Sequence, residues 1–187
     1  MSDSIHVRTW RGPLAEFVIG AYQGQLCLLD YRYRRLRQRV DQRVQRNLGA
    51  SFLEADDPVS DATIAQLEEY GRGERQQFEL PLRLAGSEFQ QAVWQALMAV
   101  PYGGTASYGE LAERLGQPQA VRAVANANGA NALALVVPCH RIIGRRGELV
   151  GYGGGLELKR RLLRLEQEHV GQLPLFADHP SAETNDE

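Results

Sequence analysis

The chain has 187 residues, of which 43% are hydrophobic and 24% charged, and this suits one domain or two small ones with an apolar core. Two cysteines, Cys27 and Cys139, are too few and too far apart for a disulfide framework or a metal site. No apolar run approaches the ~20 residues of a membrane span, and the N-terminus lacks the apolar region of a signal peptide. We therefore expect a cytoplasmic protein with free thiols, no bound metal and no membrane contact.

The net charge of −2 is unevenly distributed. Residues 171–187 contain four acidic residues and no Lys or Arg, so the rest of the chain carries a net charge of +2. That excess is too small to demonstrate a nucleic-acid partner, because non-specific DNA binding grows with the number of phosphates neutralised.

Three strands open the chain. Residues 5–10, 16–22 and 25–33 are rich in strand-forming residues and are separated by Gly-Pro and Gly-Gln turns, which predicts an antiparallel meander. Cys27 lies between two leucines in the third strand, where a small apolar filler is the simplest interpretation.

Two helices and an extended segment follow. Residues 33–50 have apolar side chains at four-residue spacing, and their arginines are interpreted as a solvated face. A second helix is expected over 61–70, and residues 78–86 run extended to a domain boundary near Gly86. The apolar positions are Leu36, Val40, Val44 and Leu48 in the first helix, and Ile64, Leu67 and Tyr70 in the second.

The second half is predicted to be mostly helical. Ser87 and Gln90 form a capping-box pattern that begins a helix, and Pro101 follows its end. Residues 107–116 and 119–129 then form two short helices joined by a tight turn, which is the spacing of a helix-turn-helix.

The second of these short helices has an unusual composition. Ala120, Ala123 and Ala127 form a stripe of small residues, and Arg122 is its only charged residue. Such a helix could approach a groove wall closely while the arginine projects from it.

A cysteine and a histidine stand together after the apolar run 133–137. Pro138 is expected to end that run as a strand and to force a turn, and contact between Cys139 and His140 through a water is more plausible than a direct bond. A thiol becomes a nucleophile when a base takes its proton, and a base histidine needs a partner for its other nitrogen. Glu166 supplies a carboxylate at the inner edge of the last helix.

Together with other residues, "VVPCHRIIG" resembles the active-site segment of the O6-alkylguanine-DNA alkyltransferases, also called methylated-DNA-protein-cysteine S-methyltransferases. The resemblance is strong over residues 87–170, whereas residues 1–86 match only in their plan of strands and helices, which is similar to the small ribonuclease-H-like domain of the family. The matching positions, in order, are Tyr108, Arg122, Asn131, the Pro-Cys-His-Arg block, Tyr152 with Gly154 and Gly155, and Glu166.

The resemblance implies an α/β fold: a ribonuclease-H-like domain over 1–86, a mostly helical domain with a helix-turn-helix over 87–170, and a disordered acidic tail over 171–187. It also implies a monomer that flips O6-alkylguanine out of double-stranded DNA and transfers the alkyl group irreversibly to Cys139. No cofactor is implied.

The resemblance also assigns roles to individual residues. His140 relays the thiol proton through water, Glu166 orients His140, and Asn131 braces the hinge. Tyr108 aids release of guanine, and Arg122 fills the gap left by the flipped base. Further DNA contacts are expected from Ala120, Ala123, Ala127 and Arg141, and the substrate pocket from Val137, Pro138, Tyr152, Gly153 and Gly154.

Two features point to subtypes. Gly153 and Gly154 stand where some relatives carry Arg-Trp, so groups larger than methyl are expected to be accepted, unless these glycines serve only the geometry of the loop. The chain also lacks the cysteine-rich activator domain of inducible relatives, so a stand-alone type, often called Ogt, is expected.

The tail contains a second pattern, "QLPLF". It resembles peptides by which bacterial replication and repair proteins dock on the sliding clamp, and the alternative is that it folds back on the body. The residues concerned are Gln172, Leu173, Leu175 and Phe176.

Two rival functions remain open. A non-catalytic alkyltransferase-like protein would bind the lesion without transfer, but such proteins have Trp in place of Cys139. A papain-type Cys-His hydrolase would catalyse acyl transfer, but the adjacency of Cys139 and His140 and the upstream helix pair disfavour it.

Overall fold

A four-stranded sheet forms the first part of the molecule. The structure is a computed structural model, which describes residues 3–171. The strands are β1 (Ser4–Arg11), β2 (Glu16–Tyr22), β3 (Gln25–Tyr31) and β4 (Ser51–Glu54), in the order β3-β2-β1-β4. The meander of β1, β2 and β3 is antiparallel as predicted. β4 pairs parallel to β1 and was not predicted.

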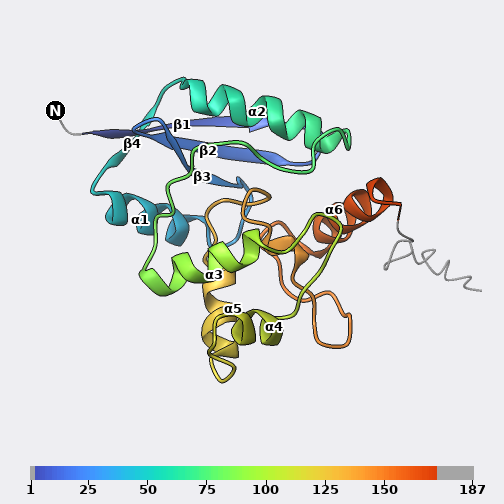
Figure 1. Ribbon diagram of the computed structural model, residues 1–187. Helices are drawn as coiled ribbons and strands as arrows, with labels where there is room; N and C mark the ends of the chain where they lie inside the picture. Colours follow the sequence, from blue (N-terminus) through green and yellow to red (C-terminus); the bar gives the residue numbers. More distant parts are fainter. Residues whose placement is uncertain (1–2, 172–187) are drawn as a thin grey trace, which may run out of the picture.

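One helix covers each face of this sheet (Figure 1). Helix α1 (Arg37–Leu48) buries Val40 and Val44 against one face with Cys27, which is fully buried and packs as the filler that the sequence predicts. Helix α2 (Pro58–Gly71) packs Leu67 and Tyr70 against the other face.

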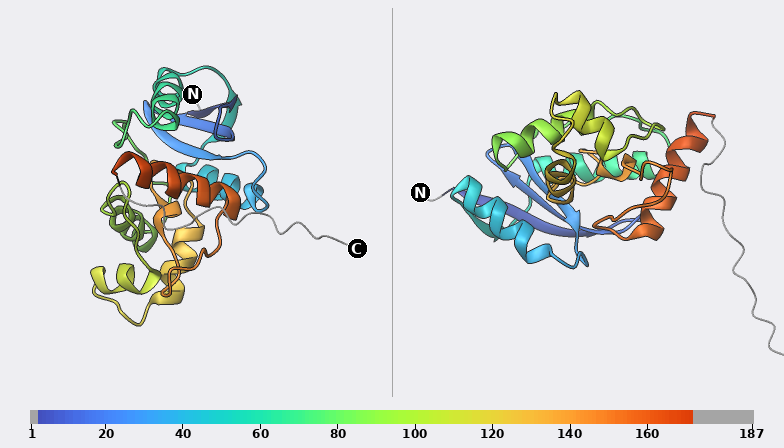
Figure 2. Two further views of the ribbon diagram at one scale, coloured as in Figure 1. Left: turned by 90° about the vertical axis from the view of Figure 1, so that its right-hand side faces the viewer. Right: turned by 90° about the horizontal axis from the view of Figure 1, so that it is seen from below.

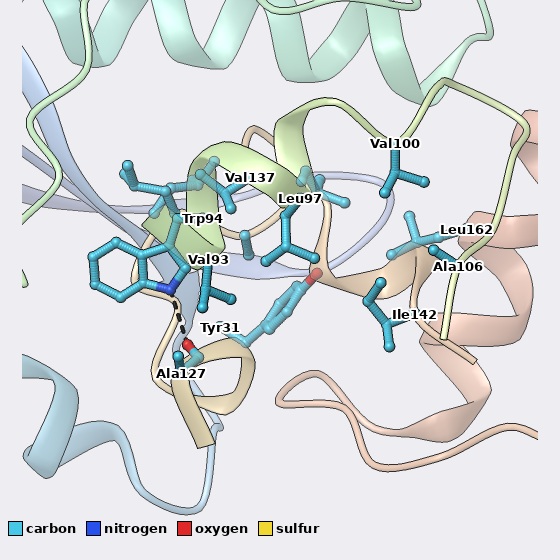
Figure 3. Close-up of a cluster of buried hydrophobic side chains, with 14 of the residues drawn as sticks. Tyr31, Val93, Trp94, Leu97, Val100, Ala106, Ala127, Val137, Ile142 and Leu162 are labelled. Carbon is cyan, nitrogen blue, oxygen red and sulfur yellow. Dashed lines mark hydrogen bonds between the residues drawn. The ribbon is translucent and has the colours of Figure 1, made fainter. Parts of the chain in front are cut away.

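The helical part begins with α3 (Glu88–Met98). The capping box of Ser87 and Gln90 is present, as predicted, and satisfies two backbone N–H groups that would otherwise lack partners. The face of α3 that contains Val93 and Leu97 enters the main core, where Trp94 donates a hydrogen bond from Nε1 to the Ala127 carbonyl at 2.9 Å (Figure 3).

Three more helices complete the fold: α4 (Tyr108–Arg114), α5 (Val121–Gly129) and α6 (Leu156–His169). The left view of Figure 2 shows α6 between the sheet with α2 on one side and the helices α3, α4 and α5 on the other. In residues 3–171 no helix has both the length and the apolar character to cross a bilayer. The acidic tail and the "QLPLF" residues, 172–176, lie outside the described part.

Candidate active site

The segment before Cys139 is a loop, not the predicted strand. Leu29 on β3 donates its N–H to Ala132 O at 2.8 Å and accepts from the N–H of Ala134 at 2.8 Å, but no ladder continues beyond this bridge. Leu135 then turns the chain with a φ of 69°. An apolar run predicts burial rather than conformation, and here it fills the space beside β3 as a loop.

Asn131 holds this loop closed. Its side-chain Oδ1 accepts from the N–H of Leu133 at 2.9 Å, and its Nδ2 donates to the carbonyl of Val137 at 2.8 Å. The same Nδ2 lies 3.2 Å from the Sγ of Cys139. One amide therefore braces the loop and contacts the thiol that the loop presents.

A single 3₁₀ turn, Cys139–Arg141, carries the thiol and the imidazole. Sγ of Cys139 opens on a cavity of about 220 Å³, whereas His140 is fully buried, and no hydrogen bond joins the two side chains in the described structure. Burial raises the pKa of the Cys139 thiol, although the Asn131 hydrogen bond and the charge of Arg34 act in the opposite direction. At neutral pH the group is a thiol, so its attack requires removal of a proton.

His140 and Glu166 form a buried pair. Nε2 of His140 lies 2.6 Å from Oε1 of Glu166, and both side chains are fully buried. Burial by itself would raise the pKa of Glu166, but the hydrogen bonds from His140 and Arg141 and the positive charge of Arg141 hold it well below its usual range. An ionised carboxylate only accepts hydrogen bonds, so Nε2 carries the proton and Nδ1 is left as the basic nitrogen.

The basic nitrogen has no partner in the described part of the chain. Nδ1 of His140 is buried and makes no hydrogen bond to any protein group. Burial lowers the pKa of His140, although Glu166 acts in the opposite direction, so the imidazole is neutral near pH 7. This nitrogen can therefore accept a proton.

Arg141 does not lie where the resemblance implied. We expected a DNA contact, but its side chain is 7% exposed and donates to Glu166 and to the carbonyl of Val100 at 2.7 Å. It holds the carboxylate from inside and is not available to a surface ligand.

Lys159 was missed by the sequence analysis. It is fully buried on α6, and its Nζ donates to the carbonyl of Val150 at 2.7 Å. Burial lowers its pKa to about 8, and its charge favours the thiolate of Cys139. The signal was present, because Lys159, Leu162 and Glu166 follow the three- and four-residue spacing of one buried helix face.

The N-terminal part also contributes to the cavity. Arg34 donates to the carbonyl of Asn131 at 3.0 Å and to that of Gly129, and it pairs with buried Asp30 at 3.3 Å. Arg43 donates to the carbonyl of Ala130. The interpretation of these arginines as a solvated face is therefore wrong for Arg34 and Arg43.

The cavity walls correct part of the predicted substrate pocket. Tyr152 and Gly153 line it, and the Tyr152 hydroxyl is hydrogen-bonded to that of Tyr31. Val137 is fully buried in the core, Pro138 lies on a different cavity, and Gly154 is packed beneath the Tyr31 ring. The complete lining is Asp30, Tyr31, Arg34, Tyr108, Asn128, Gly129, Asn131, Ala134, Cys139, Gly151, Tyr152 and Gly153.

The small-residue stripe on α5 is only partly accessible. Arg122 and Ala123 are exposed and Ala120 is half-buried, whereas Ala127 is 3% exposed and belongs to the core. The expected contact of Ala127 with DNA is therefore wrong. Tyr108, at the start of α4, lines the cavity that contains Cys139.

Both a family model and curated relatives match this chain. A family model described as "6-O-methylguanine DNA methyltransferase, DNA binding domain" matches residues 88–168. A methylated-DNA–protein-cysteine methyltransferase of Mycobacterium leprae is 43% identical over 166 residues, which are 89% of this chain and 94% of the relative. One from Mycobacterium tuberculosis is 40% identical over 92% of this chain and 99% of the relative.

Solved structures agree with the sequence relatives. The crystal structure of Mycobacterium tuberculosis O6-methylguanine methyltransferase matches with a TM-score of 0.73 and 38% identity, over 88% of this chain and 94% of that one. A structure of Mycobacterium tuberculosis OGT in complex with DNA matches over the same shares with a TM-score of 0.74. Identity and coverage of this extent show that the chain belongs to the methylated-DNA–protein-cysteine methyltransferase family.

Proposed function

We propose that this protein repairs DNA by transferring the alkyl group of O6-alkylguanine to Cys139, once per molecule. The observation that carries the proposal is the placement of the thiol: Sγ faces a cavity, with Asn131 beside it and the buried His140–Glu166 pair behind it. Membership of the family and a relative solved with DNA support the same reaction.

The steps balance as a displacement at carbon. The thiol proton passes to Nδ1 of His140 through water, and Sγ attacks the alkyl carbon. The bond between that carbon and O6 breaks, and the guanine leaves with a proton from Tyr108, whose hydroxyl is restored by the proton that His140 received. Burial raises the pKa of Tyr108, so its hydroxyl still carries the proton at neutral pH. The product is a thioether, which thiol exchange does not reverse.

The base has to leave the stack before this step. O6 lies on the base-pairing edge, so a thiol in the wall of a cavity reaches it only in a flipped nucleotide. We assign α4 and α5 as a helix-turn-helix, with exposed Arg122 entering the gap and Ala120 and Ala123 facing the groove. Two helices joined by residues 115–120 support this assignment.

The division of the chain also belongs to the proposal. A meander with one helix on each face supports a ribonuclease-H-like domain over residues 1–86, followed by the alkyl-acceptor domain over 87–170. Contact of the tail with a sliding clamp remains a prediction that a peptide of residues 170–178 can test by calorimetry, with a Leu175→Ala, Phe176→Ala peptide as control.

Peptide mass spectrometry after incubation with a duplex containing O6-methylguanine tests the reaction. We expect one methyl group per molecule, on Cys139, and none on a Cys139→Ser variant. Cys27 is an internal control, because burial raises its pKa to about 12 and its Sγ contacts the Gly20 carbonyl. Tight binding with unmodified Cys139 would instead support the non-catalytic alternative.

A further inference from the structure

Tyr70 links the sheet part of the molecule to the active-site carboxylate. It lies in the last turn of α2, is fully buried, and donates its hydroxyl proton to Oε1 of Glu166 at 2.7 Å. The two residues are 96 positions apart. Burial raises the pKa of Tyr70 well above its usual value, so the hydroxyl remains a donor across the working pH range.

The donors around Glu166 fix both of its oxygens. Oε1 accepts from Tyr70, from Nε2 of His140 at 2.6 Å and from Nη2 of Arg141 at 3.0 Å. Oε2 accepts from Nε of Arg141 at 2.8 Å and from the N–H of Gly103 at 3.2 Å. Among these donors to Oε1, Tyr70 is the one that comes from the N-terminal sheet part, whereas His140 and Arg141 come from the 3₁₀ turn that carries Cys139.

The tyrosine ring is itself held in place. It packs against Phe78 with ring centroids 5.5 Å apart and meets Tyr102 edge-on at 6.1 Å. A ring fixed on both sides presents its hydroxyl in one direction, which is what orienting a carboxylate requires.

We propose that Tyr70 is a positioning residue for alkyl transfer: its hydroxyl sets the orientation of Glu166 Oε1, and through it the ring of His140 that accepts the Cys139 proton. This inference rests on the proposed function for its effect on rate. Its structural part, the coupling of Tyr70 to His140 through Glu166, is measurable without any transfer.

Tyr102 provides a matched control in the same aromatic cluster. Its hydroxyl is buried but has no hydrogen-bond partner in the described part of the chain. Tyr102→Phe therefore removes a hydroxyl next to Tyr70 without breaking a hydrogen bond, whereas Tyr70→Phe breaks one to the carboxylate.

The first readout is the single-turnover transfer rate as a function of pH, on a duplex containing O6-methylguanine. We expect Tyr70→Phe to slow transfer roughly tenfold, which is the lower end of the effect seen when the outer hydrogen-bond partners of metal-bound histidines are removed. Loss of one donor leaves more of the Oε1 charge facing the imidazole, so the acid limb of the profile should move to higher pH. Tyr102→Phe should stay within about twofold of wild type.

The second readout is the imidazole N–H proton of His140 in ¹⁵N-histidine-labelled protein. Tyr70→Phe should shift this resonance and Tyr102→Phe should not. In the unmodified chain, a magnetisation-transfer signal between the Tyr70 hydroxyl proton and the His140 Nε2 proton is expected, so the coupling is tested even if a variant folds poorly.

Combination with Glu166→Gln completes the test. If Tyr70 acts through Glu166, adding Tyr70→Phe to Glu166→Gln should slow transfer by less than twofold further. A wild-type rate and an unmoved His140 resonance in Tyr70→Phe would overturn the inference, as would full additivity with Glu166→Gln. A wild-type protein that transfers no methyl group would refute the proposed function instead. The His140 imidazole resonance would then still show whether Tyr70 is coupled to His140 through Glu166.

Discussion

Arg141 donates two hydrogen bonds to Glu166, from Nε to Oε2 at 2.8 Å and from Nη2 to Oε1 at 3.0 Å. Both side chains are almost fully buried, so each charge depends on the other for compensation. Removing one partner of such a pair commonly costs about 3–5 kcal/mol, because the remaining charge is left unpaired in the interior.

Glu166→Gln is expected to slow methyl transfer and also to lower the free energy of unfolding by about 3 kcal/mol. The amide cannot neutralise Arg141. Its NH₂ group is a donor and would face the donors that now bind the carboxylate, so at least one of them would lose its acceptor. Transfer kinetics, DNA binding and urea unfolding check this, with DNA affinity expected to change little. A wild-type transfer rate would contradict the orienting role of Glu166.

Arg122→Ala should weaken binding to duplex DNA and slow transfer from it by about tenfold, or ~1.4 kcal/mol out of the few kcal/mol that unstacking costs. Reaction with free O6-benzylguanine should be nearly unchanged, because Arg122 does not line the cavity. Arg46→Ala, exposed on α1, is the control. Equal losses on free base and duplex would exclude a role in flipping.

Arg34→Ala should destabilise the protein by about 1.5–3 kcal/mol and slow transfer. The change leaves Asp30 buried without its partner. It also removes the hydrogen bonds from Arg34 to the carbonyls of Gly129 and Asn131, and these bonds attach the loop before Cys139 to the N-terminal part. Arg35→Ala, exposed beside it, should change neither quantity. Urea unfolding measures the stability and single-turnover kinetics the transfer rate. Equal behaviour of the two variants would show that Arg34 does not hold the loop before Cys139.

Gly153 and Gly154 should respond differently to substitution. A Cβ at 154 would lie 2.7 Å from the Tyr31 ring, so Gly154→Ala should cost about 1–3 kcal/mol of stability. A Cβ at 153 would lie 3.1 Å from Nε of the Arg34 side chain, at the cavity wall. Gly153→Trp should therefore lower the benzyl-to-methyl rate ratio by about tenfold or more. An unchanged ratio would leave Gly153 with a role in loop geometry only.

Stability should fall as the pH falls through about 6.5, the ordinary pKa of histidine. Burial lowers the pKa of His140 in the folded state, so below that pH the unfolded chain binds a proton that the folded chain does not. The low pKa of Glu166 adds a second loss below about 4.5, its ordinary value. Urea midpoints between pH 8 and pH 5 measure the first loss, which should be smaller in His140→Gln.

The sequence predicted the elements whose pattern is local. Alternation and turn residues identified the meander, and helical periodicity placed Glu166 on the inner face of α6, where it is fully buried. β4 was missed because Ser51–Glu54 has only four residues and pairs with a distant strand. Arg34 was misjudged because its acceptors lie 95 and 97 positions away, beyond any local pattern.

The outer edge of β3 leads to one further consequence. Leu26 pairs with Pro81 and Arg83, and Leu29 pairs with Ala132 and Ala134, so short segments cover the backbone groups that an edge strand would otherwise expose. Uncovered edges are templates for β-pairing between molecules. A change that releases the segment next to Asn131 therefore does more than stop alkyl transfer, because it also exposes the edge of β3 to other molecules. Variants in which this segment is released should aggregate before their sheet unfolds.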